Sequence, residues 1–475
     1  MPTRFRVVEF ELRAGECRTR LPFRFGNVTM TRAPLLHARV RIETAAGTAE
    51  GLAADLLVPR WFDKDPAKSI SDNQRDLVDA VRRAGDNALA AEASTVFALV
   101  RDVRATVFAD TSPLAPLRLR HGFGVAMLER AVLDALCRAE RVSFFRALRS
   151  DLFGIEPSAD DPADFDLAAT LPSVPAPRIE VRHTVGMQDP LTTTEITPSQ
   201  RCADGLPQAL EEDVRTYGLR LFKVKIGAGR AADLARLRAI RTVLDATAPG
   251  NWQFSVDANE QYTNLDDLVG LLVDLHAEPD LGGRLLYVEQ PLPRHLTFDP
   301  ASASAVARAA ALAPLLIDEA DVDTHAFPRA LELGYRGVAV KNCKGVIRAV
   351  INHARCARLR AAGTPAFQSA EDLTNLPVVA LQQDLATIQA LGLPHAERNG
   401  HHYFAGLAHL PAGEAAAAFA AHPDLYRRHG DGYALKIEGG ALAVDSLACE
   451  GYGYACPIDF AARAPIAAAG ESAAS

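Results

Sequence analysis

Five short apolar runs decide the fold of this chain, and each of them leads to a charged residue: LFKVKI (221–226), FSVDANE (254–260), LLYVEQPL (285–292), LLIDEA (315–320) and GVAVKN (337–342). Each run has the length of a buried strand. Amphipathic stretches such as AADLARLRAIRTVLDA and LDDLVGLLVDLHA lie between them. This alternation predicts a parallel sheet built from repeated βα units.

The same pattern extends on both sides of these five runs. EVRHTV (180–185), PAFQSAE (365–371) and PHAERNG (394–400) bring the number of candidate strands to eight. A closed (β/α) barrel typically needs about 250 residues, which matches this part of the chain better than an open sheet does. We therefore predict a (β/α) barrel over residues 166–404.

The flanking regions have a different texture. Residues 4–57 read as strands with one glycine-containing hairpin, and helical spacing follows near 71–84, 87–108 and 123–148. The polar, proline-rich stretch GIEPSADDPADF (154–165) has the composition of a domain boundary. We predict an α+β domain over 1–165 and an Ala- and Gly-rich segment over 405–475, whose hairpin GYALKIEGGALAVDS returns to the first domain.

Three carboxylates close successive predicted strands. Asp257, Glu289 and Asp318 are 32 and 29 positions apart, about one βα repeat each. In a barrel, residues at the carboxyl ends of the strands converge on one mouth. Because a buried carboxylate is costly without a partner, three of them in register predict a shared cation. Oxygen ligands favour Mg²⁺, or Mn²⁺, over zinc.

Three lysines belong to the same pattern. Lys223 and Lys225 alternate on one strand and therefore point the same way, and Lys341 reaches the mouth from four strands further round. The proximity of two ammonium groups and a metal is expected to lower the pKa of at least one lysine, so that it can act as a base near neutral pH. Lys344 is expected to cap or solvate the following turn.

These motifs together resemble the enolase superfamily, in particular its muconate lactonizing enzyme-like subgroup within the mandelate racemase/muconate lactonizing enzyme family. The likeness rests on Lys-x-Lys in LFKVKIG, the DAN of Asp257 to Asn259, the EQP of Glu289 to Pro291, the DE of Asp318 and Glu319, and Lys341 in VAVKN. It covers residues 180–400 and the helix LERAVLDAL before them.

The resemblance implies a modified (β/α)7β barrel covered by a capping domain made from the N-terminal region and the C-terminal segment. It implies Mg²⁺ on Asp257, Glu289 and Asp318, acid/base catalysis by Lys225 and Lys341 with Lys223 tuning Lys225, and supporting roles for Asn259 and Glu319. The implied reaction removes the proton α to a substrate carboxylate to give a metal-stabilised enediolate, as in racemases, epimerases, cycloisomerases and o-succinylbenzoate synthases.

Substrate identity is left open by departures from the family patterns. The predicted seventh strand, FQSAEDLTN, lacks the His of acid-sugar dehydratases, which disfavours that alternative. Dipeptide epimerases carry Asp-x-Asp where this chain has Glu397-Arg398-Asn399. Candidate substrate-binding residues are Phe23, Arg24 and Phe25 in a predicted loop at 21–31, together with Glu371, Asp372 and Glu397. Glu371 and Asp372 are equally well placed to cap a helix.

Other features leave their roles open. The loops 56–66, with Trp61 and Phe62, and 187–204 lie where they would border the mouth, and packing is favoured for the two aromatic residues. His183, His395, His401 and His402 lack a metal-ligand pattern and are expected to have hydrogen-bonded structural roles.

Composition limits the partners and the location. The net charge of −8 offers no basic field for nucleic acid or an anionic membrane. No signal peptide or membrane span is evident, and seven scattered cysteines without Cys-x-x-Cys indicate reduced thiols. We expect a cytoplasmic homo-oligomer acting on a small carboxylic acid.

Two alternatives compete with this interpretation. Gly227-x-Gly229-x-x-Ala232 formally matches a dinucleotide fingerprint, although the preceding strand carries two lysines where an apolar strand is expected. A catalytically silent barrel used for binding is the other, and the retained charged residues disfavour it.

Overall fold

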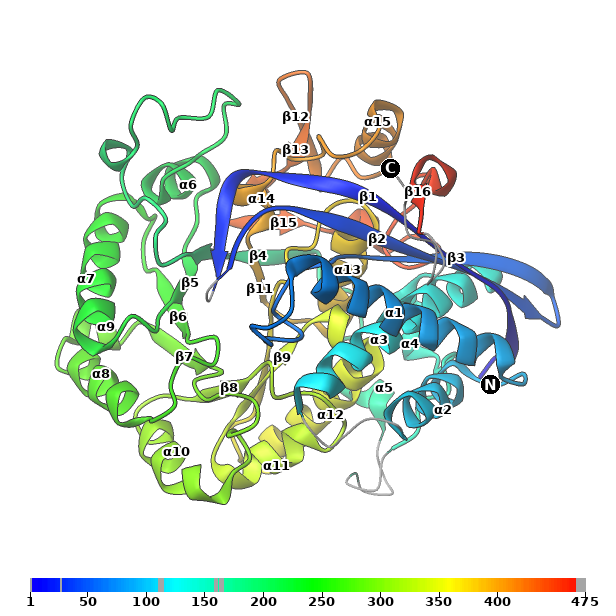
Figure 1. The fold of residues 1–475 in the computed structure, drawn as a ribbon, viewed down its shortest axis with the longest axis horizontal. Helices are drawn as coiled ribbons and strands as arrows, with labels where there is room; N and C mark the ends of the chain where they lie inside the picture. Colours follow the sequence, from blue (N-terminus) through cyan, green and yellow to red (C-terminus); the bar gives the residue numbers. More distant parts are fainter. Residues whose placement is uncertain (1, 26–27, 110–114, 158–160, 162–165, 467–475) are drawn as a thin grey trace.

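A parallel barrel forms the centre of the molecule, and an antiparallel sheet with its helices lies across one side of it (Figure 1). The structure, a computed structural model, describes residues 2–25, 28–109, 115–157, 161 and 166–466. Within these residues, no helix is both long and apolar enough to cross a membrane.

The eight predicted barrel strands are confirmed in the described part of the chain. They pair in parallel and in chain order, and the barrel closes because the last strand pairs with the first. The strands are β4 (Arg178–Val185), β5 (Leu221–Lys225), β6 (Gln253–Asp257), β7 (Leu285–Glu289), β8 (Leu315–Ile317), β9 (Gly337–Val340), β10 (Phe367–Ala370) and β11 (His395–Arg398).

Helices surround the barrel because the segments that connect its strands have an apolar face. In the connecting helix at Arg230–Thr247, for example, Leu234, Leu237 and Leu244 are buried against the sheet layer. The helices are α6 (Leu210–Tyr217), α7 (Arg230–Thr247), α8 (Asp266–His276), α9 (Pro279–Gly282), α10 (Ala303–Ala310), α11 (Ala326–Leu333), α12 (Val346–Ala361) and α13 (Val379–Leu391). Directly after β11 comes the four-residue helix α14 (Gly400–Tyr403), consistent with the modified (β/α)7β form.

Shorter elements complete the connections. They are α5 (Leu167–Thr170) before the barrel and the 3-10 turns η1 (Thr193–Glu195), η2 (Pro300–Ser302), η3 (Asn342–Lys344), η4 (Asp445–Leu447) and η5 (Phe460–Ala462). The most important for function is η3, since it directly follows Lys341 at the end of β9 and turns the chain back toward β8.

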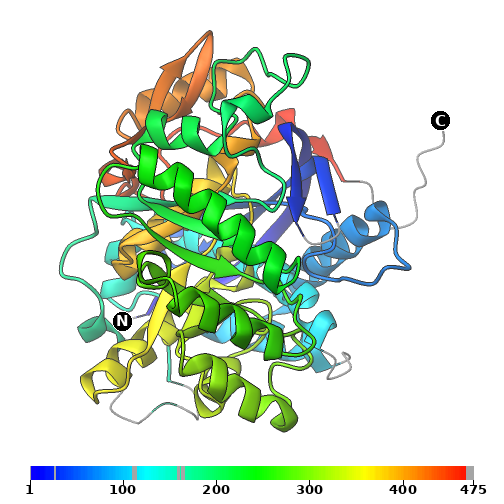
Figure 2. The same cartoon turned by 90° about the vertical axis from the view of Figure 1, so that its left-hand side faces the viewer.

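The N-terminal region forms an α+β unit, seen beside the barrel in Figure 2. Its sheet is built from β1 (Phe5–Phe25), β2 (Val28–Thr44) and β3 (Gly47–Leu56), and its helices are α1 (Ile70–Ala90), α2 (Val96–Ala109), α3 (Ala115–Ala139) and α4 (Phe144–Arg149). The hairpin predicted at a glycine turn is present, with Gly47 at φ +130° as the first residue of β3 and paired with Thr44, the last residue of β2.

One local prediction in this region was wrong. In the described residues 21–25 and 28–31 the predicted loop is strand, because Phe23 pairs with Met30 and Arg24 with Thr29. The helical spacing predicted at 123–148 is shared between α3 and α4, because the chain takes φ +53° at Arg141 and starts α4 with Ser143 as its N-cap. A single left-handed residue ends an α-helix, and periodicity alone does not reveal it.

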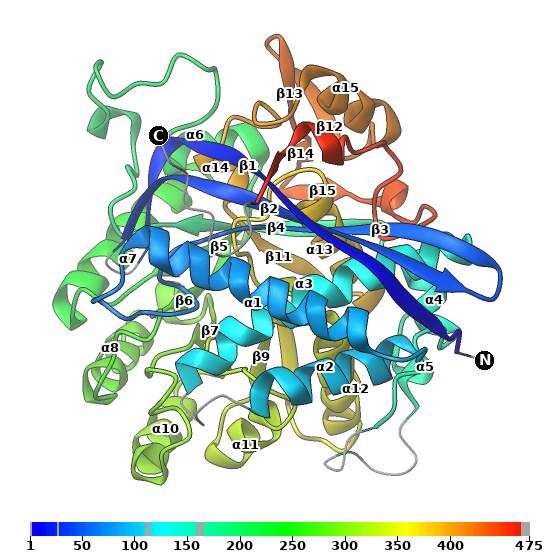
Figure 3. The same ribbon diagram turned by 45° about the vertical axis from the view of Figure 1, so that its right-hand side comes forward.

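Helix α3 joins the N-terminal sheet to the barrel, and Figure 3 shows it between the two. It packs so closely on β3 that a Cβ on Gly51 would lie 2.2 Å from the Ala135 backbone nitrogen. On its other side, Glu129 accepts a hydrogen bond from the Ile347 backbone at the start of α12, with the two atoms 2.7 Å apart. The N-terminal unit is therefore anchored next to the turn that follows Lys341.

The C-terminal residues return to both halves of the molecule. Their elements are α15 (Ala412–Ala421), β12 (Tyr426–His429), β13 (Gly432–Leu435), β14 (Ile437–Glu438), β15 (Ala441–Ala443) and β16 (Ala464–Pro465). The short strand β16 pairs with β1, whereas β15 pairs with β4 of the barrel. The segment predicted as one hairpin thus divides between two hairpins, β12–β13 and β14–β15, and the second one extends the barrel sheet.

Candidate active site

Lys223 lies at the centre of a ring of carboxylates inside the barrel. Its ammonium nitrogen is 3.0 Å from Asp257, 2.9 Å from Glu289, 2.8 Å from Glu371 and 2.9 Å from Glu397. Burial alone would lower the pKa of Lys223, but these four negative charges outweigh it and raise the pKa well above its ordinary value. Lys223 is therefore protonated in this arrangement.

Lys225 and Lys341 each contact a different strand-end carboxylate. Lys225 Nζ donates to Asp257 Oδ2 at 2.5 Å, and Lys341 Nζ donates to Asp318 Oδ2 at 2.6 Å. Burial opposes the charge on Lys341, while the Asp318 carboxylate raises its pKa above the ordinary value. The sequence predicted a lowered pKa for at least one lysine, but the pKa values of Lys223 and Lys341 are both raised. The cause is the direct contact of each ammonium group with carboxylate oxygens.

Asp318 is held from two sides. Its backbone nitrogen donates to Gln290 Oε1 at 2.8 Å, and its Oδ1 accepts from Lys344 Nζ at 3.0 Å. The prediction for Lys344 was wrong, because η3 directs this side chain back under Asp318, where it is buried and also lies 3.3 Å from Asp321. A lysine one turn after a strand end can reach the preceding strand in this way, and strand spacing does not reveal it.

The carboxylates repel one another wherever a lysine does not balance them. Burial, followed by the charges of Asp257 and Glu371, raises the pKa of Glu289 well above its ordinary value. Burial and the charge of Asp318 raise the pKa of Glu319 to about 7. One carboxylate oxygen on each, Oε2, is buried and has no hydrogen-bond partner among the residues that the structure describes, although Glu289 Oε2 lies within ion-pair distance of Lys223.

These features fit a divalent cation at the strand ends. Asp257 and Glu289 end adjacent strands and Asp318 follows the next one. Burial and the charges of Asp257 and Asp318 raise the pKa of Glu289, and this repulsion is the kind of field that a hard cation relieves. In the structure, lysine ammonium groups lie against the same oxygens. The donor set is entirely carboxylate oxygen, which suits Mg²⁺ or Mn²⁺.

The N-terminal unit covers Lys341. Trp61 lies on the segment after β3, is only 6% exposed, and places its ring 4.5 Å from Lys341 Nζ. Arg294 fixes this segment by donating to the Trp61 and Phe62 backbone oxygens at 2.9 and 3.1 Å. Arg294 also binds Glu260, three residues after Asp257. The segment after β3 therefore contacts the candidate active site through Trp61 and Lys341, although ordinary packing was predicted for its aromatic residues.

Asn259 and Glu319 lie beside the three carboxylates. The Asn259 backbone nitrogen donates to Asp257 Oδ1 at 2.8 Å, and its side chain donates to Glu319 Oε1 at 3.4 Å. Lys64, from the N-terminal unit, donates to the Asn259 backbone oxygen at 3.0 Å. Both residues are thus placed to support the strand-end carboxylates.

The residues predicted to bind substrate lie in different surroundings. Glu371 and Glu397 are fully buried and engaged with Lys223, and Glu371 also binds Arg182. Asp372 is buried, accepts from the Asn375 backbone at 2.8 Å, and forms an ion pair with Arg398, so it stabilises the turn after β10.

The hairpin residues lie on the side of α14. Phe23 stacks on Tyr403 with ring centroids 4.1 Å apart. Arg24 is exposed and borders a cavity that also contacts Asp189 and His402. The side chain of Phe25 lies outside the described residues.

The dinucleotide alternative loses its structural basis. The backbone nitrogens of Gly227 and Ala228, which would bind a pyrophosphate, instead donate to the Asp233 carboxylate at 3.0 and 3.1 Å. In addition, Lys223 and Lys225 on β5 point into the barrel and contact Asp257. The turn is thus a capped helix start within a barrel repeat.

Comparison with known proteins agrees with the barrel. Residues 206–402 match the family model described as enolase C-terminal domain-like. No curated protein matches the chain by sequence.

Solved structures share the whole fold at low sequence identity. Muconate lactonizing enzyme from Mycobacterium smegmatis, complexed with muconolactone, aligns with a TM-score of 0.62 at 18% identity, covering 97% of this chain and 100% of that chain. An enolase from Bradyrhizobium complexed with magnesium and mandelic acid gives 0.60 at 15%, covering 98% and 100%. A dipeptide epimerase from Cytophaga hutchinsonii, complexed with Mg and D-Ala-L-Val, gives 0.56 at 14%, covering 96% and 97%.

Proposed function

Because residues 206–402 match the enolase C-terminal domain-like family model, we propose that this chain is an enolase-superfamily enzyme that moves the proton α to a substrate carboxylate with the help of Mg²⁺. One observation carries this proposal. Lys225 ends β5 and Lys341 follows β9, four strands further round the ring of eight, on either side of Asp257, Glu289 and Asp318. A planar carbon held between them would face one amine on each side.

The metal is assigned to Asp257, Glu289 and Asp318, with Mn²⁺ as a possible substitute. When bound there, it would supply positive charge to the substrate carboxylate as negative charge develops during proton removal. The same cation would take the carboxylate oxygens now paired with lysines. Loss of the pairing partner, together with burial, lowers the pKa of a lysine, which makes a neutral amine available as the base.

The remaining steps belong to the protein. Lys225 removes or returns the proton on one face of the α-carbon, and Lys341 does so on the other. Lys223, itself paired with Glu397, holds the Asp257 carboxylate in position. Lys344 and Gln290 hold Asp318 in the same way. Trp61 and the segment after β3 keep water from Lys341.

This arrangement allows either 1,1-proton transfer or elimination with cycloisomerisation. The named relatives include a lactonizing enzyme and a dipeptide epimerase, so both reaction types are represented among similar folds. We propose that the substrate is a small carboxylic acid and that the protein is a cytoplasmic homo-oligomer.

The test is incubation with Mg²⁺ in D₂O against N-acylamino acids, dipeptides, muconates and other carboxylic acids, followed by NMR. Deuterium at the α-carbon with the skeleton unchanged identifies a racemase or epimerase, and new olefinic or lactone signals identify elimination or cycloisomerisation. Binding of an acid with neither change, in the presence of bound Mg²⁺, would favour the catalytically silent barrel.

A further inference from the structure

A second group of ionisable side chains lies outside the barrel interior. On β4, Arg182 and Thr184 point inward, because they contact Glu371 and Glu397. His183, between them, therefore points outward to the helix layer. There it meets Asp213 of α6 and His401 of α14, and all three side chains are buried.

The three side chains are close enough to share one ion. His183 Nδ1 is 3.0 Å from His401 Nε2, and His183 Nε2 is 3.7 Å from Asp213 Oδ2. One nitrogen or oxygen of each residue lies within 4.8 Å of those of the other two. Ligands of a tetrahedral zinc ion, at about 2.0–2.1 Å from the metal, lie about 3.3 Å from one another, so small side-chain adjustments suffice.

The group is also short of hydrogen-bond partners. Asp213 is 0% exposed, and neither of its carboxylate oxygens makes a hydrogen bond within the described residues, although His402 Nδ1 lies 2.9 Å from Oδ2. The Nδ1 of His401 has no partner in the same part of the chain. A buried carboxylate flanked by imidazoles, with Asp213 Oδ1 and His401 Nδ1 still available, is a set of donors suited to a cation.

The charge states suit metal ligands. Burial lowers the pKa of His183 to about 4 and lowers that of His401 well below its ordinary value, so both imidazoles are neutral. Despite its burial, Asp213 keeps a pKa of about 2 because His402 and His183 favour its charged form. Neutral imidazole and ionised carboxylate are the forms that bind metals.

We propose that His183, Asp213 and His401 bind one divalent transition-metal ion, with zinc the best match, at a site separate from the carboxylates of the barrel mouth. Nitrogen ligands distinguish this site from the all-oxygen set that favours Mg²⁺. His402 Nδ1 lies 2.9 Å from Asp213 Oδ2, and despite burial this carboxylate raises the pKa of His402, so His402 holds Asp213 in place and is not counted among the ligands. The sequence indicated no metal-ligand pattern for these histidines and predicted hydrogen-bonded structural roles, so the proposed metal site departs from that prediction.

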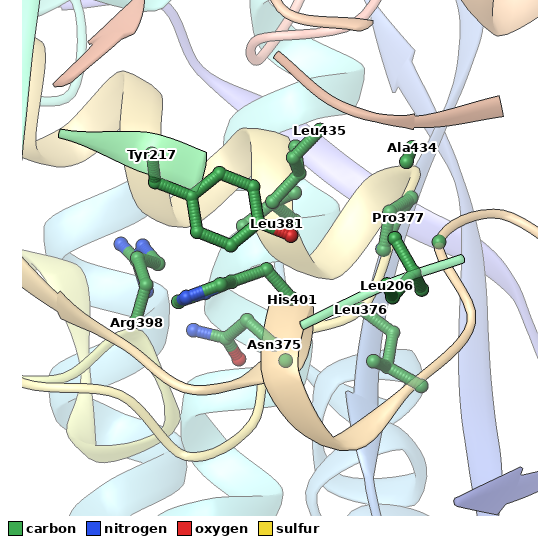
Figure 4. A pocket seen from close by; sticks show the side chains of 12 residues that line it. Leu206, Tyr217, Asn375, Leu376, Pro377, Leu381, Arg398, His401, Ala434 and Leu435 are labelled. Atoms are coloured by element: carbon green, nitrogen blue, oxygen red, sulfur yellow. The ribbon is translucent and has the colours of Figure 1, made fainter. Parts of the chain in front are cut away.

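The site would join the two ends of the barrel sheet. His183 stands opposite Arg398 where β11 closes onto β4, and His401 lies three residues after Arg398. Figure 4 shows His401 between Tyr217 and Asn375, at a cavity of about 20 Å³. The edge of Tyr217 faces the His401 ring with centroids 5.2 Å apart. A metal here would therefore stabilise closure of the barrel rather than take part in proton transfer.

The experiment uses the full chain without an affinity tag, stripped with a chelator and then given Zn²⁺ or Co²⁺. We expect about one zinc per chain after desalting, a visible Co²⁺ spectrum typical of four-coordinate nitrogen and oxygen ligands, and a higher Tm with zinc. Asp213→Asn, which keeps the side-chain shape, and His401→Gln should lose all three effects.

Two matched variants separate this site from other binding. His395→Gln removes a histidine of β11 that is not part of the site and should keep zinc, and Asp257→Asn should keep zinc while it loses Mg²⁺. Failure of the wild-type chain to retain zinc or to gain thermal stability from it would overturn the proposal, whether or not the variants fold. Equal zinc retention by Asp213→Asn and His395→Gln would overturn it as well.

Discussion

Lys225 and Lys341 contact different carboxylates from opposite sides of the barrel mouth, Lys225 at Asp257 and Lys341 at Asp318. The two carboxylates end β6 and follow β8, and Glu289 lies on the strand between them. The arrangement thus places one amine at each end of a row of three acids. This symmetry is what a reaction on both faces of one carbon requires.

Removing one acid from the row should remove the metal. Asp318→Asn keeps the size of the side chain but eliminates the charge that faces Lys341 and Lys344. We expect Mg²⁺ affinity, measured by calorimetry, to fall at least about 100-fold, because one of three charged ligands is lost. Glu180→Gln, an exposed position on β4, should bind Mg²⁺ like the wild type. Equal affinities in the two variants would show that Asp318 is not a ligand.

The fluorescence of Trp61 should show whether Lys341 is paired with Asp318. The chain has two tryptophans, and Trp252→Phe leaves Trp61 as the only one. Cation–π contacts are worth about 0.5–2 kcal/mol, and release of Lys341 from Asp318 changes the charge next to the indole. Mg²⁺ should therefore alter the fluorescence of Trp252→Phe. An unchanged spectrum there, or the same change in Trp61→Phe, would contradict the contact.

Arg182 should be essential for the stability of the barrel floor. It is 0% exposed and donates to Ser255 at 2.7 Å, to Ser369 at 3.1 Å and to the Glu371 carboxylate. Arg182→Met leaves a buried carboxylate with fewer partners, which costs about 3–5 kcal/mol. The control is Arg178→Met, at an exposed position of the same strand. Thermal unfolding checks the difference, and equal Tm values for the two variants would refute it.

His422 should make stability depend on pH. Its Nε2 accepts a hydrogen bond from the Ala455 backbone at 3.1 Å, and burial lowers its pKa to about 4 from 6.5. The unfolded chain therefore binds the proton first, so the contribution of His422 is complete above pH 6.5 and is lost between pH 6.5 and 4. At pH 5 the loss is about 1–2 kcal/mol. His422→Gln should flatten this part of the stability profile, and a profile parallel to that of the wild type would count against the assignment.

The barrel was predictable because each strand is a short apolar run with an amphipathic helix after it. The candidate site was predicted from the same pattern: the structure places Asp257, Glu289 and Asp318 at or just after strand ends, and their role as metal ligands stays a prediction. Lys223 and Lys225 alternate on β5, so their common direction followed from strand geometry alone.

Other features depend on contacts between distant segments. His183, Asp213 and His401 come together only when β11 closes against β4, and nothing in their spacing indicates it. Trp61 reaches Lys341 because Arg294 ties its backbone to the barrel. The polar and apolar residues at 21–25 and 28–31 follow a pattern that fits a loop as well as two strands. Only the pairing of β1 with β2 distinguishes these two structures.

The central claim is that the two lysines transfer the α-proton of a carboxylic acid beside a metal. It is tested most directly by α-proton exchange in D₂O with Mg²⁺, comparing the wild type with Lys225→Gln, Lys341→Gln and the control Lys436→Gln. General acid–base catalysis contributes about 10²–10⁴-fold, so we expect exchange to fall by that factor in each active-site variant and to stay unchanged in the control. Exchange that persists at the wild-type rate after both lysines are replaced would contradict the account.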